Sequence, residues 1–220
     1  MITAIIGVGN IGSPLARHLV DGSQRVVLAS KDESRAQALA HQLGPLARAA
    51  SVHDAIAGAD VVVFAVLFDT IKELIASHAR LLENKVIVDP SNPLRFGENG
   101  QMTRTLPADQ SAGSVIAALL PTGAHFVKAF GTLGADAFAN AANRVPRAVL
   151  FYATDDDAAA TTIEQLIRTA GFTPLKAGGV ADAARIEMPG GDLHQFGSLN
   201  GELVDLEHAR AALAARQVAA

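Results

Sequence analysis

A glycine motif close to the N-terminus constrains the fold of this chain more than any other feature. The motif Gly7-Val8-Gly9-Asn10-Ile11-Gly12 follows a short apolar segment and precedes a segment of helical periodicity. This strand–turn–helix context with the spacing G-x-G-x-x-G is the fingerprint of a dinucleotide-binding βαβ unit. We expect Gly7 to form the tight turn, Gly9 to let the backbone approach a pyrophosphate, and Gly12 to let helix and strand pack closely. A glycine turn without a ligand is the alternative.

Apolar β-type segments alternate with helical segments along the chain, which predicts an α/β fold. The expected architecture is a Rossmann-type doubly wound, mostly parallel sheet with a small C-terminal α/β extension. The run Val61–Val66 is continuously apolar, as expected of a strand covered on both faces. Strands are expected at residues 3–6, 25–29, 46–49, 60–66, 85–89, 125–130, 148–154 and 173–176. Helices are expected at residues 11–21, 33–43, 52–57, 70–82, 112–120, 135–140, 158–170 and 203–216.

The composition argues against several classes of function. The 220 residues include no Cys, which excludes disulfides, thiolate metal sites and cysteine nucleophiles, so redox chemistry must come from a bound cofactor. The net charge of −4, without a basic stripe, argues against nucleic acid as a partner. No apolar stretch approaches the roughly 20 residues that span a bilayer, and the N-terminus lacks a basic leader region. We therefore expect a cytoplasmic globular protein, without a metal site.

The end of the second expected strand indicates which dinucleotide would bind. An NAD enzyme carries an acidic residue about 20 residues after the motif, where it holds the ribose 2′-hydroxyl. Here the chain has Ser30 and Lys31, followed by Arg35. A hydroxyl and two cations suit a 2′-phosphate, since each charge-assisted donor contributes about 1.5–3 kcal/mol. The sequence therefore predicts NADP(H), although the two cations could also be ordinary solvated charges at a helix start.

The sequence lacks the signatures of two familiar reductase types. The one tyrosine, Tyr152, is followed four residues later by Asp156, so the Tyr-x-x-x-Lys pair of short-chain dehydrogenases is absent. Enzymes of the hydroxyacid dehydrogenase and imine reductase type append an all-helical domain, whereas strands resume here at residue 148. The acidic run Asp155-Asp156-Asp157 is interpreted as a helix cap rather than a metal site.

The chain resembles the NADP oxidoreductases that depend on coenzyme F420, an 8-hydroxy-5-deazaflavin, and the related cytosolic domains of membrane ferric reductases. The resemblance covers most of the chain and is most specific in the glycine motif and the 2′-phosphate residues. Weaker matches are residues 65–68, 89–93 and 128–133. The resemblance implies cofactor contacts from Gly7, Val8, Gly9, Asn10, Ile11, Gly12, Ser30, Lys31, Arg35, Val66, Leu67, Ser91 and Asn92, and acceptor contacts from Gly131, Thr132 and Leu133.

Two departures from that family bear on the acceptor. The deazaflavin enzymes have His where this chain has Gly131, and hydroxyl residues where this chain has Met188-Pro189-Gly190-Gly191 after Arg185. The missing side chain at residue 131 predicts a pocket for a broader or differently tilted ring. A carbonyl or imine substrate would instead need a positioned acid, for which His194, in the glycine-rich loop near Arg185, is the best candidate.

The leading hypothesis is an NADPH-dependent oxidoreductase that transfers hydride between NADP(H) and a deazaflavin or flavin-like acceptor, bound as a dissociable co-substrate. The alternatives are a reductase of a small carbonyl or imine compound and a non-catalytic NADP(H) sensor. We expect residues 1–140 to form the NADP-binding domain and residues 141–220 to complete the acceptor site. The Pro-, Gly- and Asn-rich stretch 89–113 is predicted to be a long loop of the active site. The resemblance implies a homodimer. The Ala-rich segment 203–220 offers small side chains for close helix packing at its interface, and this composition is equally compatible with an intramolecular lid.

Overall fold

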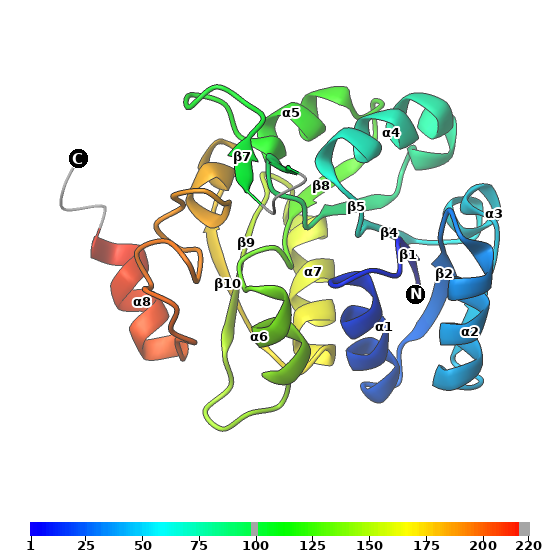
Figure 1. Cartoon of the computed structure of the whole chain (residues 1–220), viewed down its shortest axis with the longest axis horizontal. Coiled ribbons are helices and arrows are strands. Elements are labelled where there is room, and N and C mark those ends of the chain that lie inside the picture. The colour runs from blue at the N-terminus through cyan, green and yellow to red at the C-terminus, as the bar shows by residue number, and fades with distance from the viewer. Residues whose placement is uncertain (98–100, 216–220) are drawn as a thin grey trace.

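One sheet with the strand order β10-β9-β8-β5-β4-β1-β2-β3 forms the centre of the computed structural model (Figure 1), which describes residues 1–97 and 101–215. Six neighbouring strands of this sheet, β3, β2, β1, β4, β5 and β8, are parallel. β9 pairs antiparallel with β8, and β10 pairs parallel with β9. The mostly parallel Rossmann-type sheet is therefore confirmed. The strands are β1 (Ile2–Ile6), β2 (Arg25–Ala29), β3 (Ala47–Ala49), β4 (Val61–Phe64), β5 (Val86–Asp89), β8 (His125–Lys128), β9 (Val149–Ala153) and β10 (Thr173–Gly178).

Helices cover both faces of the sheet, as Figure 1 shows. The apolar cluster on one face joins the strands to α1 (Gly12–Asp21), α2 (Glu33–Leu43), α6 (Ala135–Asn140) and α7 (Asp157–Thr169). The cluster on the other face joins them to α3 (Val52–Ala57), α4 (Phe68–Leu82) and α5 (Ala112–Leu119). A third cluster packs the 3₁₀-helix η1 (Val180–Ile186) and α8 (Leu206–Ala215) on β9 and β10.

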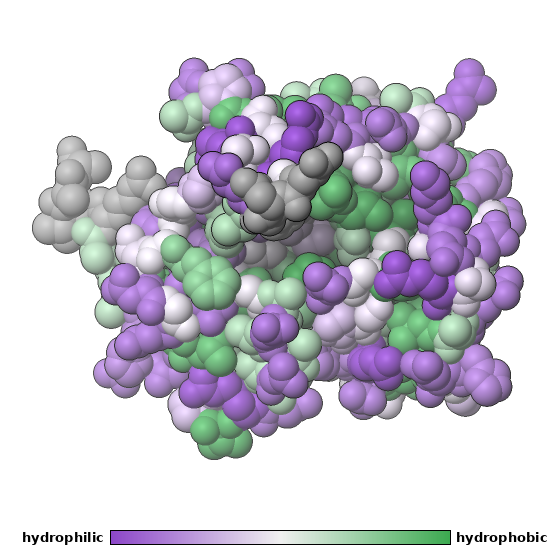
Figure 2. Space-filling model, viewed as in Figure 1, coloured by the Kyte–Doolittle hydropathy of each residue, from purple (hydrophilic) through white to green (hydrophobic). Residues whose placement is uncertain are grey.

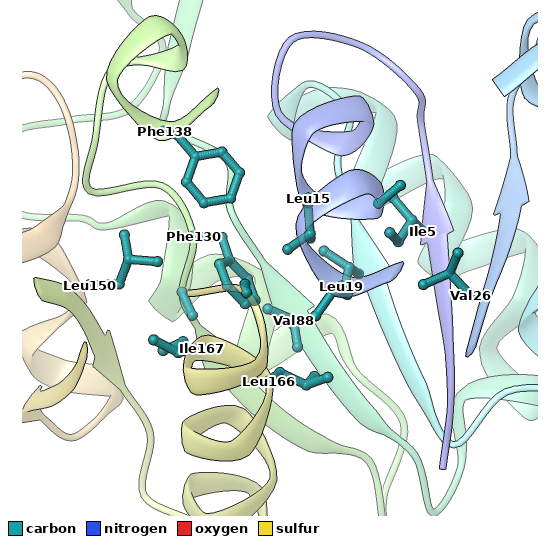
Figure 3. Close-up of a cluster of buried hydrophobic side chains, with 14 of the residues drawn as sticks. Ile5, Leu15, Leu19, Val26, Val88, Phe130, Phe138, Leu150, Leu166 and Ile167 are labelled. Carbon is teal, nitrogen blue, oxygen red and sulfur yellow. The ribbon is translucent and has the colours of Figure 1, made fainter. Parts of the chain in front are cut away.

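The continuous apolar strands follow from this two-sided cover. In β4, Val61 and Val63 pack in the first cluster, and Val62 and Phe64 pack in the second. Successive side chains of a strand point to opposite faces, so both sets must be apolar when helices lie on each side. Figure 3 shows the first cluster, in which side chains from α1 and α7 meet those of the strands.

Two parts of the chain differ from the sequence prediction. The stretch 89–113 is not one long loop, because it contains the antiparallel pair β6 (Leu94–Phe96) and β7 (Met102–Arg104) and the start of α5. Residues 98–100 of this stretch and residues 216–220 of the expected C-terminal segment lie outside the described residues. The 3₁₀-helix η1 was not predicted from the sequence either.

Several local predictions are confirmed. The Asp156 side chain accepts a hydrogen bond from the Ala159 N–H and caps α7, as expected of the acidic run. Tyr152 is a buried residue of β9, and its hydroxyl donates to Glu164 at 2.6 Å. Within the described residues, the structure contains no helix with the length and apolar composition needed to cross a bilayer.

Candidate active site

A cavity of about 630 Å³ opens at the carboxyl ends of the parallel strands. Its wall is formed by the glycine motif after β1, the segment after β4, the segment after β5, and the segment 133–135 beyond β8. The C-terminal part of the chain contributes Met188, His194 and Phe196. Figure 2 shows hydrophobic residues, in green, around the hollow near the middle of the molecule. This is the edge at which open α/β sheets bind their ligands, and the volume lies in the range usual for small-molecule sites.

The three motif glycines have the geometry that a dinucleotide requires. Gly7 has a φ of +102°, and a Cβ placed there would lie 2.4 Å from the Ala65 carbonyl oxygen. A Cβ at Gly12 would lie 1.9 Å from the Gly7 carbonyl oxygen, which shows how closely α1 approaches the strand end. A Cβ at Gly9 would meet nothing within 4 Å, because this backbone faces open space.

The N-terminus of α1 suits an anion. Its N-cap residue is Ile11, which provides no side-chain cap, and its first turn contains no acidic residue. The N–H groups and the dipole of a helix N-terminus attract phosphate. Because Gly9 lines the cavity at this point, the structure fits a pyrophosphate there.

The turn after β2 carries the residues expected to select the 2′-phosphate. The Arg35 side chain lines the cavity, with Nη2 3.4 Å from the Val8 carbonyl oxygen. Lys31, four residues earlier in the sequence, is exposed. The nearby acid, Asp32, caps α2 and accepts hydrogen bonds from the Ser34 hydroxyl and N–H at 2.6 and 3.1 Å. The Ser34 hydroxyl contributes most to lowering the pKa of Asp32. Asp32 therefore serves as a helix cap, and the turn keeps the two cations, Lys31 and Arg35, that suit a 2′-phosphate.

A buried ionic cluster, which sequence reasoning missed, lies beside the cavity. The Lys128 ammonium is 2.7 Å from Asp89 and 3.3 Å from Glu187, and the three side chains are at most 2% exposed. Glu187 also accepts the N–H groups of Ala112 and Gly113 at 2.9 and 2.8 Å, at the start of α5. Burial alone would lower the pKa of Lys128, but attraction by Asp89 and Glu187 raises it, so the amine stays charged.

This cluster fixes the Ser91–Asn92 turn, for which the family resemblance implies a contact with the nicotinamide part of the cofactor. Asp89 accepts the Ser91 N–H at 2.7 Å, and the Lys128 ammonium donates to the Ser91 carbonyl. The next residue, Asn92, accepts the Met188 N–H at 2.7 Å and donates to the Gly131 carbonyl at 3.4 Å. The Ser91–Asn92 turn is therefore held on one side by Asp89, Lys128 and Gly131, in or just after strands β5 and β8, and on the other side by Met188.

The structure argues against His194 as a proton donor. The side chain is buried, its Nδ1 accepts the Phe196 N–H at 3.1 Å, and the imidazole donates to the Gly131 carbonyl. Burial lowers the pKa of His194 to about 4, so the imidazole is neutral near pH 7. Its nitrogens bind backbone groups, and its role is to anchor the loop. Arg185 does not line the cavity and instead pairs with Asp192, with Nη2 2.8 Å from Oδ2.

The expectation that residue 131 faces the acceptor is wrong in this structure. A Cβ at Gly131 would lie 2.4 Å from the Pro90 carbonyl oxygen, so a side chain there would collide with the neighbouring turn. Gly131 and Thr132 are buried and do not line the cavity, whereas Leu133 does. The predicted acceptor segment 131–133 therefore lies beside the cavity, and only Leu133 forms part of the cavity wall.

Comparisons with known proteins show which family and which solved structures this chain is similar to. The family described as NADP oxidoreductase, coenzyme F420-dependent, matches residues 2–93. These 92 residues are less than half of the 220-residue chain and are similar to that family. The description of that family is of NADP-dependent oxidoreductases.

Three proteins show the extent of the similarity. Metalloreductase STEAP3 of Rattus norvegicus is 31% identical over 183 residues, which are 83% of this chain and 35% of the rat protein. The chain thus spans about a third of that relative. A hypothetical protein from Sinorhizobium meliloti has a TM-score of 0.78 and 28% identity, over 88% of this chain and 93% of its own. A proposed F420-dependent NADP-reductase from Arthrobacter sp. FB24 has a TM-score of 0.70 and 26% identity, over 82% and 86% of the two chains.

Proposed function

We propose that this chain transfers hydride between NADP(H) and a deazaflavin- or flavin-like acceptor that binds and leaves as a co-substrate. The observation that carries the proposal is the extent of the cavity. It continues from the glycine motif past the Ser91–Asn92 turn to Met188 and Phe196. The lining residues beyond that turn, Met188 and Phe196, would border a second group bound next to the nicotinamide. A protein that only sensed NADP(H) would not need to bind a second group there.

The proposed cofactor position assigns a role to each group of residues that is expected to contact NADP(H). Ser30, Lys31 and Arg35 would bind the 2′-phosphate, and the start of α1 above Gly9 would bind the pyrophosphate. The nicotinamide would lie beside residues 66–67 and the Ser91–Asn92 turn. The Ser91 hydroxyl supports this position, because it is buried and has no hydrogen-bond partner among the described residues. A cofactor group that bonded to it would recover about 1–3 kcal/mol of desolvation cost.

The lining residues favour a ring acceptor over a carbonyl or imine. When bound, NADPH supplies the hydride, and a reduced flavin-like ring takes its proton from water. Among the described residues that line the cavity, the ionisable side chains are Arg35 and His194. Arg35 lies at the proposed 2′-phosphate end, and His194 is neutral. A carbonyl or imine reductase needs a positioned acid, and the described lining does not provide one beside the Ser91–Asn92 turn.

The proposal is tested by offering acceptors in turn to the NADPH-bound protein. We expect an 8-hydroxy-5-deazaflavin or riboflavin to be reduced as NADPH is oxidised, while a small ketone and a cyclic imine are not. Faster reduction of the ketone or imine would favour the carbonyl or imine alternative. Tight NADPH binding without oxidation by any acceptor would favour the sensor.

We also propose that the chain forms a homodimer through its C-terminal Ala-rich segment, with residues 141–220 completing the acceptor site. Support comes from the composition of residues 203–220, whose small side chains allow close helix packing. Light scattering at micromolar concentration should give twice the mass of 22.7 kDa. A mass near that of one chain would contradict the dimer but not the proposed reaction.

A further inference from the structure

Exposed hydrophobic side chains gather at the cavity mouth. Among the described residues, the exposed large hydrophobic side chains include Leu67, Met102 and Phe196, which are 62, 51 and 60% exposed. All three line the cavity, and they come from the residue before α4, from β7 and from the C-terminal segment. Single exposed apolar residues are ordinary on a protein surface, but their convergence on one cavity marks a binding site for an apolar group.

Phe196 is held in place by the segment below it. The neighbouring Gln195 donates its N–H to the Thr132 carbonyl at 2.9 Å and accepts the Gly134 N–H at 2.8 Å. A Cβ at Gly134 would lie 2.5 Å from a ring carbon of Phe196, so the ring rests directly on this glycine. One side of a fixed aromatic ring is thereby covered by backbone, while more than half of the side chain remains exposed at the cavity.

The cations near this end of the cavity have partners outside it. Arg95 and Lys72 both pair with Asp69, at 3.4 and 2.7 Å. The Arg104 guanidinium donates to the carbonyl groups of Leu106 and Gln110, at 3.0 and 2.6 Å. None of these three cations lines the cavity. The described residues that line the mouth are therefore apolar, and they include no cation for an anionic tail of the acceptor.

We propose that the acceptor is recognised by its uncharged planar ring alone, with Phe196 stacking on the ring and Leu67 and Met102 packing against its edges. The occupant is an isoalloxazine-class nucleus, and any phosphate or acidic tail remains in solvent. This inference rests on the proposed function. In the reaction, the C4–H bond of NADPH breaks and its electron pair reduces the ring. The ring gains one hydride and one solvent proton, leaving NADP⁺.

Three acceptors with the same ring and different tails test this proposal. Riboflavin has no anionic tail, FMN has one phosphate, and FAD has a dinucleotide tail. Solvent-exposed charges contribute at most about 1 kcal/mol, so we expect kcat/KM values for the three within about fivefold. A preference of more than tenfold for FMN or FAD over riboflavin would reveal an anion subsite and overturn the proposal. No NADPH oxidation with any of the three, or with a deazaflavin, would instead refute the proposed function.

Variants of the stacking residue give a second, independent result. Stacking of a planar base on an aromatic side chain contributes about 1–3 kcal/mol. We therefore expect Phe196→Ala to raise the KM for riboflavin by at least about fivefold, with an unchanged NADPH Kd. Phe196→Tyr should restore the KM, because it keeps the ring. The matched control is Leu119→Ala, an exposed apolar residue (47%) of α5 that does not line the cavity. A riboflavin KM in Phe196→Ala equal to that of the control would overturn the stacking role.

Discussion

Replacing Lys128 by Met removes the cation between two buried carboxylates. The ammonium lies 2.7 Å from Asp89 and 3.3 Å from Glu187, and the carboxylate side chains are 0 and 1% exposed. Removing one partner of a buried ion pair costs about 3–5 kcal/mol, because the remaining charge cannot return to water. This loss is a large fraction of the roughly 5–15 kcal/mol that stabilises a typical domain. The free energy of unfolding should therefore fall by about 3–5 kcal/mol.

The chain offers a matched control for this variant. Lys72 pairs with Asp69 at the same distance of 2.7 Å, but the two side chains are 39 and 49% exposed. Exposed pairs contribute about 0.2–1 kcal/mol, so Lys72→Met should cost no more than that. Urea unfolding followed by circular dichroism measures both variants. Equal losses would refute the argument that burial makes the Lys128 cluster energetically important.

The same variant should affect turnover more than cofactor binding. Lys128 donates to the Ser91 carbonyl, so its loss should shift the turn that is proposed to meet the nicotinamide. A misplacement of about 1 Å can cost about 100-fold in rate. We expect kcat to fall by about that factor, while the NADPH Kd changes little, because the contacts proposed at α1 and Arg35 are left in place. Lys128→Arg, which keeps the charge, should recover part of kcat. A rise in the NADPH Kd at constant kcat would contradict the positioning role.

Three further variants test the cofactor site and the buried histidine. Arg35→Ala should weaken NADPH binding about tenfold and leave NADH binding unchanged in calorimetric titrations; equal effects on both would contradict the 2′-phosphate assignment. Gly9→Val should fold normally, because a Cβ there meets nothing within 4 Å, yet lose NADPH binding; normal binding would place the pyrophosphate elsewhere. His194 has its pKa lowered from 6.5 to about 4, so its contribution to stability is complete above pH 6.5 and is lost as the pH falls toward 4. Wild type should lose about 3 kcal/mol more than His194→Asn over that interval; parallel pH profiles of unfolding would contradict this.

Periodicity and spacing predicted the architecture because the information for those features is local. The helices Glu33–Leu43 and Val52–Ala57 have the predicted bounds, since each begins after a capping side chain and ends at a glycine. The geometry expected of the motif glycines was equally predictable, because the strand–turn–helix context determines which glycine faces which neighbour.

Features that depend on distant parts of the chain could not be predicted in this way. Strands β6 and β7 have three residues each, too short for a periodic signal, and they exist by pairing with each other. Lys128 and Glu187 lie 59 positions apart and meet only because η1 brings its C-terminal end to the start of α5. The direction in which a side chain at residue 131 would point is determined by the contact with Pro90, which follows a different strand. Phe196 could have been noticed as an aromatic residue within the glycine-rich segment, but its exposure and its place at the cavity required the structure.

Transfer of an isotopic label tests the central claim most directly. NADPH carrying deuterium at both C4 positions would be incubated with the protein and an 8-hydroxy-5-deazaflavin, whose reduced ring keeps a transferred hydride on carbon. Mass spectrometry of the acceptor should show one deuterium gained per NADPH oxidised, because the hydride is transferred directly within one cavity. An acceptor reduced without deuterium, or bound NADPH that reduces neither a deazaflavin nor a flavin, would contradict it.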